Sequence, residues 1–391
     1  MSESSLALHS PSPPFAHWSG SRSPSLVLVG EAWGESENEI KRPFVGWSGR
    51  ELFVMLGEAL GGEDDGHAAV LRGASRLGLG WVGPRDEWLR ERGIGLTNVL
   101  ALRPPDNKID ALCVSKKDLP HDYSLGPIDQ GKYLDPQFLP ELVRLGSELT
   151  EARPNLVVAL GNIACWALLG TRGISGLRGT IASERLSGLS LKCLPTYHPA
   201  AILRQWSWRQ IAVEDLIKAR RESAFPEIRR PSRSILINPT IEEVQEWTSR
   251  ALADACPLAC DTETAKGQIT MVGFARSRSE AIVIPFRNFL EGVERLHYWS
   301  EQDEVLAWLC VRSLLLASNL KIFQNGLYDI QYFMAMGLRV MNATRDTMLL
   351  HHSIFPELQK GLGFLGSLYT NEPAWKLMRR KRASEPEKAD E

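Results

Sequence analysis

The sequence predicts an α/β protein with two domains, and two kinds of segment carry this prediction. Short apolar runs, such as residues 25–30, 155–160 and 258–261, have the length and composition of buried strands. Stretches with helical periodicity, such as residues 141–152 and 209–222, lie between such runs. Strands that alternate with helices favour a parallel sheet covered on both faces, which makes three layers. At 391 residues, the chain has room for two or three domains.

Shifts in composition set the expected domain boundaries. Residues 223–240 contain three prolines and a pair of arginines, which is typical of a linker. The expected parts are a disordered arm at 1–24, a first domain at 25–222, the linker at 223–240, a second domain at 241–375 and a disordered tail at 376–391. Inside the first domain, residues 61–95 are rich in Gly and charge, and they predict an insertion or an irregular loop.

The charge balance excludes a uniformly basic surface but leaves room for a local basic groove. The chain has 45 Lys and Arg against 47 Asp and Glu, a formal net charge of −2. Residues 1–141 hold 14 basic and 20 acidic side chains, whereas residues 142–230 hold 13 and 7. The second stretch is therefore net positive by 6 and could attract an anionic partner.

The sequence predicts a cytoplasmic protein with no membrane partner. Its start has no basic segment leading into an apolar one, as a secretory signal would have. The longest nearly apolar run, residues 156–170, is too short to span a bilayer and contains Asn162. Six scattered cysteines form no Cys-x-x-Cys pair, so we expect free thiols in a reducing compartment.

Polar side chains in the first domain gather around the predicted strand ends. Four segments stand out: residues 30–34 (GEAWG), 42–46 (RPFVG), 97–99 (TNV) and 196–204 (TYHPAAILR). Three of the four immediately follow or end a predicted strand. Because ligands of open α/β sheets bind at the carboxyl ends of the strands, these segments predict a binding site there.

In their order and number, the segments resemble the uracil-DNA glycosylase superfamily, most nearly its family 4. The patterns of that family are Gly-Glu-Ala-Pro-Gly, Pro-Phe-Val-Gly, Thr-Asn-Val with Arg-Pro-Pro, Leu-Gly, and Tyr-His-Pro-Ala with Leu-Arg. Their counterparts here are residues 30–34, 43–46, 97–105, 160–161 and 197–204. The resemblance covers about residues 25–222. It implies a three-layer glycosylase fold that binds DNA, flips out uracil and hydrolyses its N-glycosidic bond.

The resemblance also implies roles for the four pocket residues. His198 would donate a hydrogen bond to uracil O2, where negative charge develops as the bond breaks. Asn98 would read the amide edge of uracil and so distinguish it from cytosine. Phe44 would stack on the flipped base, and Glu31 would position water or stabilise the cationic sugar.

Other residues of this stretch would contact the rest of the DNA. Ile202, Leu203 and Arg204 resemble the family's loop that wedges into the duplex and holds phosphate. We expect further charge for the phosphate backbone from basic side chains nearby, namely Lys192, Arg209 and Lys218. Three neighbouring glutamates, Glu35, Glu37 and Glu39, are expected to form a solvated acidic turn.

The chain departs from the family at two places. Trp33 stands where the family has proline, so the first turn is expected to change shape and crowd the pocket. Family 4 enzymes hold an iron–sulfur cluster with four cysteines, but here no cysteine precedes Gly30, Leu102 replaces one ligand, and Cys113 alone cannot hold a cluster. We therefore expect no cluster and no other cofactor in the glycosylase domain, and a region 103–140 that is stabilised in another way.

Acidic residues of the second domain predict a metal site. Asp261 and Glu263 are two residues apart at the end of a predicted strand, so their side chains share one face. Asp329 lies at the start of a helix that follows another strand. Three convergent carboxylates suit Mg²⁺ or Mn²⁺ ions, which would activate water and stabilise the leaving oxygen of a phosphodiester.

This region resembles the DnaQ-like 3′–5′ proofreading exonuclease domain of family A DNA polymerases, which implies a ribonuclease H-like α/β fold. Asp261, Glu263 and Asp329 match its first two motifs, and Asp346 follows at a position that is more often structural. The third motif, Tyr-x-x-x-Asp or His-x-x-x-Asp, has no counterpart after Asp346. We therefore expect a C-terminally truncated domain whose exonuclease activity would need another polypeptide.

Some phage DNA polymerases place a glycosylase-like domain before the exonuclease and polymerase domains, and this chain resembles the front part of such a protein. The main hypothesis is a DNA repair or replication protein with uracil-DNA glycosylase activity, in a bacterial or phage-infected host cytoplasm, with a separately encoded polymerase chain as a further partner. Two alternatives stay open: a non-catalytic DNA-binding module of a split phage polymerase, and a nuclease completed by a partner chain.

Overall fold

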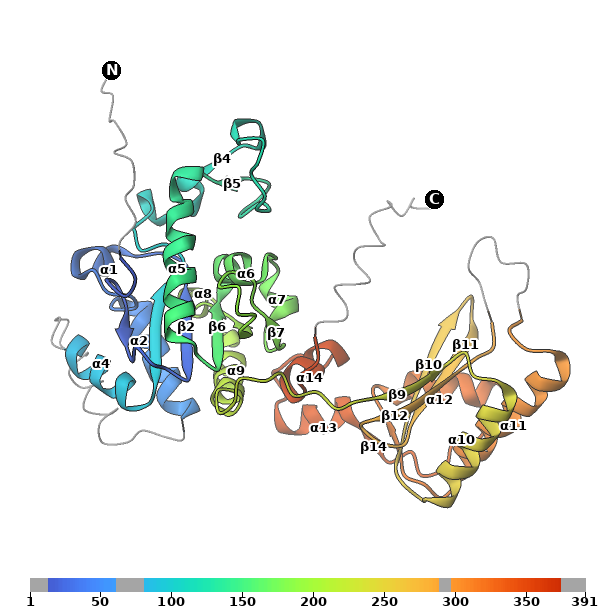
Figure 1. The fold of residues 1–391 in the computed structure, drawn as a ribbon. Coiled ribbons are helices and arrows are strands. Elements are labelled where there is room, and N and C mark those ends of the chain that lie inside the picture. The colour runs from blue at the N-terminus through green and yellow to red at the C-terminus, as the bar shows by residue number, and fades with distance from the viewer. Residues whose placement is uncertain (1–12, 61–80, 288–296, 374–391) are drawn as a thin grey trace. The chain divides into compact units, whose positions relative to one another are not determined.

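The computed structural model describes residues 13–60, 81–287 and 297–373, which form two compact units (Figure 1). The first unit comprises residues 1–229 and 366–391, and the second comprises residues 230–365. The division after Arg229 falls inside the expected linker. The end of the expected second domain, from Gly366 onward, belongs with the first unit.

The first unit is built on a six-stranded sheet whose four central strands are parallel. Its order is β1-β3-β2-β6-β8-β7, with bounds β1 (Ser19–Gly20), β2 (Leu26–Gly30), β3 (Ile94–Asn98), β6 (Leu156–Leu160), β7 (Ala182–Ser183) and β8 (Lys192–Thr196). The edge strands β1 and β7 run antiparallel to their neighbours. Every residue of the four central strands is buried, as expected where helices cover both faces of a sheet.

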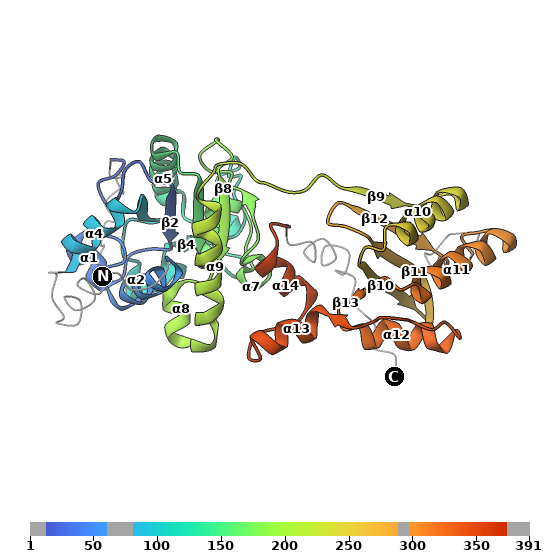
Figure 2. The same ribbon diagram turned by 90° about the horizontal axis from the view of Figure 1, so that it is seen from below.

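Helices on both sides of this sheet complete three layers. They are α1 (Glu35–Ile40), α2 (Trp47–Ala59), α4 (Val82–Glu91), α5 (Leu139–Ala152), α6 (Gly161–Leu169), α7 (Ile174–Leu177), α8 (Pro199–Arg204) and α9 (Arg209–Glu222). Figure 2 shows α5 on one side of β2 and α2 on the other. On the α5 side, Val27 and Val29 of β2 join one core with Leu145 and Leu149 of α5. The candidate residues of the first unit lie at or just after the carboxyl ends of the central strands.

Two segments expected to be irregular contain ordered elements in their described parts, residues 13–24 and 81–95. In the expected arm, Phe15 and Trp18 are buried against each other with their rings edge to face, 5.0 Å between centroids. In the expected insertion, α4 buries Trp88 and Leu89. Aromatic side chains therefore tie both segments to the core, a burial that outweighs their Ser-, Pro- or Gly-rich composition. Residues 1–12, 61–80 and 376–391 lie outside the described residues.

A small lobe at residues 105–134 is held by apolar packing and a short hairpin of β4 (Cys113–Val114) with β5 (Tyr133–Leu134). Leu112, Ile128 and Leu134 are buried in the main core. The indole of Trp166 donates to the Gly126 carbonyl at 2.9 Å, which fastens the lobe to α6. The Cys113 thiol donates to the Ile109 carbonyl at 3.2 Å.

The residues present do not fit an iron–sulfur cluster. Such a cluster takes four thiolates, and residues 1–229 contain three cysteines in all. Cys165 and Cys193 are fully buried in α6 and β8, and burial raises the pKa of the Cys165 thiol to about 12. Apolar packing and hydrogen bonds of the lobe therefore stabilise this region.

The second unit has a mixed sheet of order β14-β13-β10-β11-β12-β9. The strands are β9 (Ser234–Ile237), β10 (Leu258–Ala265), β11 (Gln268–Ala275), β12 (Glu280–Pro285), β13 (Lys321–Phe323) and β14 (Arg345–Asp346). Strands β10, β11 and β12 form an antiparallel meander, while β13 and β14 add in parallel beside β10. Strand β9, part of the expected linker, pairs in parallel with β12.

The helices of the second unit have clear local start signals. They are α10 (Ile241–Ala253), α11 (Glu301–Leu316), α12 (Gly326–Ala335) and α13 (Thr347–Ile354), and α14 (Leu362–Tyr369) crosses the division between the units. Thr240 and Glu243 form a reciprocal capping box at the start of α10. None of the helices in the described part of the chain is long and apolar enough to cross a membrane.

A buried ionic cluster fastens α5 to the end of β3. The Arg144 guanidinium, 3% exposed, lies 2.9 Å from a Glu141 carboxylate oxygen and 2.8 Å from a Glu148 oxygen. It also donates to the carbonyls of Asn98 and Val99 at 2.7 and 3.1 Å. Because a buried charge is costly when it loses a partner, each member depends on the others.

We expect Glu148→Gln to lower the free energy of unfolding by about 3 kcal/mol, since it removes one of the two charges that neutralise buried Arg144. Urea unfolding followed by circular dichroism measures this change. The matched control is Glu151→Gln, an exposed glutamate on the same helix, expected to stay within about 0.5 kcal/mol of the parent. Equal stability of the two variants would contradict the role given to the cluster.

Candidate active site in the first unit

The candidate residues of the first unit meet in one pocket at the carboxyl ends of the parallel strands. Glu31 follows β2, Asn98 ends β3, and His198 lies two residues after β8. With Phe44 they line a pocket of about 650 Å³. The sequence-based expectation that these four side chains share a site is therefore met by the geometry of the fold.

Asn98 presents an unused hydrogen-bonding group to this pocket. Its side chain is 4% exposed, and its Oδ1 atom has no hydrogen-bond partner among the described residues. Gly30 makes room for it, because a Cβ at this position would lie 2.6 Å from Oδ1 of Asn98 and 2.5 Å from Cζ of Phe44. A buried polar atom without a partner is costly and points to a ligand that would satisfy it.

Phe44 is held in an unusual backbone conformation by two buried side chains. Its φ of 54° lies in the left-handed region. Arg85 of α4, 1% exposed, donates to the carbonyls of Pro43 and Phe44. On the other side, one Glu37 carboxylate oxygen accepts the backbone N–H groups of the next two residues, each at 2.9 Å. The ring of Phe44 is thereby fixed 6.0 Å from that of His198.

The structure corrects two expectations around Phe44. Glu37 is buried and bonded to the backbone, whereas Glu35 and Glu39 are exposed, so only these two belong to a solvated turn. Sequence analysis missed Arg85 because it lies in a segment that was expected to be irregular. The spacing of Trp81, Arg85, Trp88 and Leu89, three or four residues apart along one buried face, is the helical signal that could have revealed it.

His198 is neutral, and its tautomer is fixed. It is the N-cap of α8, and its Nδ1 atom accepts the backbone N–H of Ala200 at 3.1 Å. Burial, helped by the charge of Arg204, lowers the pKa of His198 to about 4. The proton of the neutral ring therefore lies on Nε2, since an Nδ1 that accepts a hydrogen bond carries no proton.

Glu31 and Trp33 form the wall next to β2. Burial raises the pKa of Glu31, and the nearby charge of Arg204 opposes this rise. Trp33, expected to crowd the pocket, is buried at its edge, with its ring 4.7 Å from that of His17 and the Lys41 ammonium above it at 5.2 Å. Trp33 therefore lines the pocket and also contacts His17 and Lys41 of neighbouring segments.

The expected DNA-contacting residues divide into exposed and buried ones. Leu203 is 47% exposed, and Arg204 is exposed at the pocket. Ile202 is 0% exposed, so it belongs to the core and cannot wedge into a duplex in this conformation. Trp206, two residues after Arg204, is 59% exposed.

Three of the basic residues expected to contact phosphate are engaged elsewhere. Lys192 is buried, and its ammonium donates to the carbonyls of Phe225 and Glu227. Lys218 is also buried. Arg209 is paired with two glutamates of α2. The net positive charge of residues 142–230 is therefore larger than the charge that is accessible to a partner.

The three acidic residues expected to bind metal in the second unit have different surroundings, because two are exposed and one is buried and hydrogen-bonded. Asp261 and Glu263 lie within β10, not at its end, and are exposed on the same face. Asp329 is 3% exposed, and its Oδ1 accepts the backbone N–H and the hydroxyl of Thr262 at 2.9 and 2.7 Å. Among the described residues, no three His, Cys, Asp or Glu side chains are grouped to hold an ion. The arrangement does not fit a two-metal site.

The carboxylates of the second unit are nevertheless near one another, and Asp346 has a structural role. Burial, with the charges of Asp329 and Glu263, raises the pKa of Asp261 to about 6. Asp346 caps α13 by accepting the N–H of Met348 at 2.8 Å, and it also accepts the N–H groups of residues 325 and 326. By accepting the last two of these N–H groups, Asp346 fixes the start of α12, the helix that carries Asp329.

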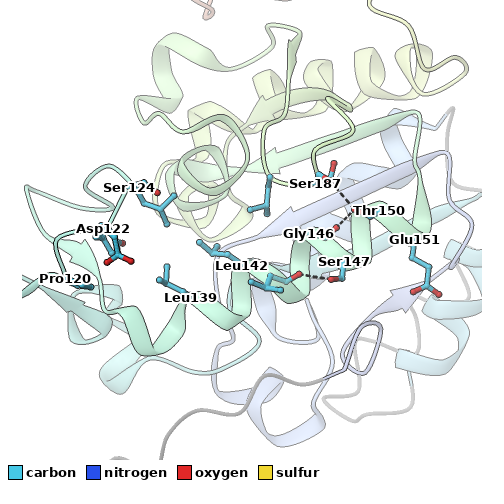
Figure 3. A pocket seen from close by; sticks show the side chains of 14 residues that line it. Pro120, Asp122, Ser124, Leu139, Leu142, Gly146, Ser147, Thr150, Glu151 and Ser187 are labelled. Carbon is cyan, nitrogen blue, oxygen red and sulfur yellow. Dashed lines mark hydrogen bonds between the residues drawn. The ribbon is translucent and has the colours of Figure 1, made fainter.

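A larger pocket of about 890 Å³ lies elsewhere in the first unit, between the segment around Pro120–Leu125 and one face of α5 (Figure 3). Apolar and hydroxyl side chains dominate it. The hydroxyls of Ser147 and Thr150 donate to backbone carbonyls of α5, at 3.0 and 2.8 Å. Because it lacks convergent titratable side chains and is not at the strand ends, we regard the smaller pocket as the functional one.

Comparison with known proteins agrees with this assignment of the site to the first unit. The family model of the uracil DNA glycosylase superfamily matches residues 17–219, which include all four pocket residues. The type-4 uracil-DNA glycosylase of Pyrobaculum aerophilum is 28% identical over 196 residues, 49% of this chain and 74% of that protein. Those of Archaeoglobus fulgidus and Thermotoga maritima are 27% and 26% identical, and cover 51% and 50% of this chain and 77% and 76% of their own lengths. With more than half of its length matched by the family model, the chain belongs to the uracil DNA glycosylase superfamily.

Proposed function

We propose that the first unit is a uracil-DNA glycosylase that hydrolyses the N-glycosidic bond of uracil flipped out of DNA. The observation that carries this proposal is the unpartnered Oδ1 of buried Asn98, which faces a pocket shared with Phe44 and the Nε2–H of His198. An amide acceptor, an aromatic ring and a hydrogen-bond donor match the N3–H, the π-face and the O2 atom of uracil.

In the proposed reaction, the C1′–N1 bond breaks and its electron pair stays with uracil, which leaves as an anion. Neutral His198 donates its Nε2 hydrogen bond to O2, where the charge develops. A water molecule then adds to C1′ of the cationic sugar and loses a proton. Glu31 is placed to accept that proton, because a raised pKa makes its carboxylate a better base.

The Asn98 amide gives the site its choice of base. Uracil presents a donor at N3 and an acceptor at O4, whereas cytosine presents an acceptor and a donor. The amide oxygen of Asn98 accepts from N3–H, and its NH₂ group donates to O4. Arg144 holds the Asn98 backbone carbonyl and so fixes the main chain that carries the amide. Cytosine would leave both of its groups unpaired against this amide.

We expect His198→Ala and Asn98→Ala each to slow uracil excision by about 100- to 1000-fold, since each removes a preorganised group at the leaving base. Single-turnover cleavage of a labelled uracil-containing oligonucleotide measures the rate. His121→Ala, at an exposed histidine of the lobe, serves as the control and should match the parent. Full activity in both pocket variants would contradict the roles assigned to His198 and Asn98.

Titration of His198 is expected to produce no step in the rate of excision near the ordinary pKa of histidine. His198 has its pKa lowered to about 4 and stays neutral over this range. On acidification, Glu31 is protonated first because its pKa is raised, and His198 follows, so activity falls on the acid side only. Single-turnover rates from pH 4 to 9 in the parent and in Glu31→Gln test this, and a step centred near 6.5 that persists in Glu31→Gln would contradict it.

For the second unit, we propose a ribonuclease H-like exonuclease fold that holds DNA without cutting it unless another polypeptide, such as a separately encoded polymerase chain, completes it. An antiparallel meander, β12-β11-β10, followed by two parallel strands, β13 and β14, supports the fold. Asp261 and Glu263 on one exposed face, near Asp329, support a relation to the nuclease motifs. The hydrogen-bonded position of Asp329 supports the lack of cutting.

We expect the chain alone to degrade single-stranded DNA no faster with Mg²⁺ or Mn²⁺ than with EDTA, because its carboxylates do not converge on an ion. A 5′-labelled oligonucleotide analysed on a denaturing gel gives the measurement. The control is Asp261→Ala, which should behave like the parent. Metal-dependent digestion that Asp261→Ala abolishes would show that the site works in this chain, contrary to the proposal.

A further inference from the structure

The last described residues of the chain contact the first unit, although the family match ends at residue 219. We call residues 366–372 the C-terminal segment. It contains the end of α14 and lies against α9 and the turn at Gly179. Ser367 and Leu368 of the segment are each 7% exposed. Side chains of the segment are therefore buried as in a core.

A buried lysine holds the segment by its backbone. Lys218 of α9 is 3% exposed, and its ammonium donates to the carbonyls of Gly179 at 2.6 Å, of Ser367 at 2.9 Å and of Thr370. Two of these carbonyls lie at the end of α14, where a cation is favoured by unpaired carbonyl groups and the helix dipole. Burial lowers the pKa of Lys218 to about 8. The segment thus supplies two of the three acceptors that this ammonium uses.

The surface that receives the segment has the shape for close backbone contact. Gly179 has a φ of 72°, and a Cβ there would lie 2.8 Å from the Ser367 carbonyl oxygen. Only glycine permits this approach without strain. Farther along, Asn371 donates to a Glu222 carboxylate oxygen at 3.0 Å. Contacts therefore extend along the segment from Ser367 to Asn371.

A continuous set of hydrogen bonds runs from the segment to the end of β8. Arg178 donates to the Ser367 hydroxyl at 2.9 Å and forms a buried ion pair with Asp215. The other oxygen of the Asp215 carboxylate accepts both the Arg178 Nε–H at 2.9 Å and the Thr196 hydroxyl at 2.7 Å. Thr196 is the last residue of β8, two residues before His198. The N–H of Gly179 also donates to the carbonyl of Pro195 in β8, at 2.8 Å.

We propose that the C-terminal segment is an intramolecular partner of the glycosylase domain, and that Ser367 is a positioning residue that fixes the end of β8 and hence His198. The effect on catalysis rests on the glycosylase activity proposed above, whereas docking of the segment does not. Through Arg178 and Asp215, the segment limits the movement of the strand end that carries the hydrogen-bond donor. A glycosylase domain cut at the end of the family match would lack this restraint.

Docking can be tested without any activity, by acylating the protein with acetic anhydride at pH 8 and following each lysine by mass spectrometry. We expect Lys218 to be acylated at least tenfold more slowly than exposed Lys117 in the full chain. Ser367→Trp, which cannot fit the buried position, should raise the Lys218 rate at least tenfold. Equal rates at Lys218 and Lys117 in the parent chain would overturn the proposal.

The positioning role has its own readout in steady-state excision of uracil. Ser367→Ala removes one hydrogen bond to Arg178, and we expect it to lower kcat about three- to tenfold with KM for DNA unchanged. Ser353→Ala, at an exposed serine of α13, is the matched control and should leave both constants unchanged. A rise in KM alone, or no change in kcat, would overturn the positioning role. Loss of excision in the parent chain itself would instead refute the proposed function, while the acylation result would still stand.

Discussion

The position of the pocket residue Asn98 depends on the hydrogen bonds that the Arg144 guanidinium makes to the end of β3. Arg144 reaches from α5 to the end of β3, where it binds the carbonyls of Asn98 and Val99 and is neutralised by Glu141 and Glu148. A strand end has carbonyl groups that no further strand pairs, and burying them requires donors. Arg144 supplies these donors, and the Oδ1 atom of the Asn98 side chain has no hydrogen-bond partner among the described residues.

The same arrangement recurs next to two other residues of the pocket, with different side chains. Arg85 and Glu37 hold the peptide groups on either side of Phe44, and Arg178 with Asp215 holds the end of β8 before His198. In each case a buried charged group binds backbone or hydroxyl groups rather than the ligand. Preorganised groups of this kind contribute to catalysis because the protein need not rearrange when charge develops.

The place of the pocket could be predicted from the sequence because its residues follow strands with clear apolar runs, as Asn98 does after residues 94–97. The sequence could not separate Ile202 from Leu203, because two adjacent apolar residues differ only in which side of a short helix they occupy. Lys218 was expected to meet phosphate and is buried instead. The Ser367 carbonyl that it binds lies 149 residues away in the sequence, so no local sequence pattern could have predicted this contact. Long-range burial of charge is the part of this fold that residue spacing does not encode.

The left-handed backbone of Phe44 also bears on how the pocket could change by mutation. A β-branched residue such as Val or Ile is strongly disfavoured at a positive φ, whereas unbranched or aromatic side chains are better tolerated. A descendant of this protein could therefore replace Phe44 by Leu, Tyr or His more readily than by Val or Ile. The side chains open to this wall of the pocket are limited by the torsion angle of one residue, before any contact with a ligand is considered.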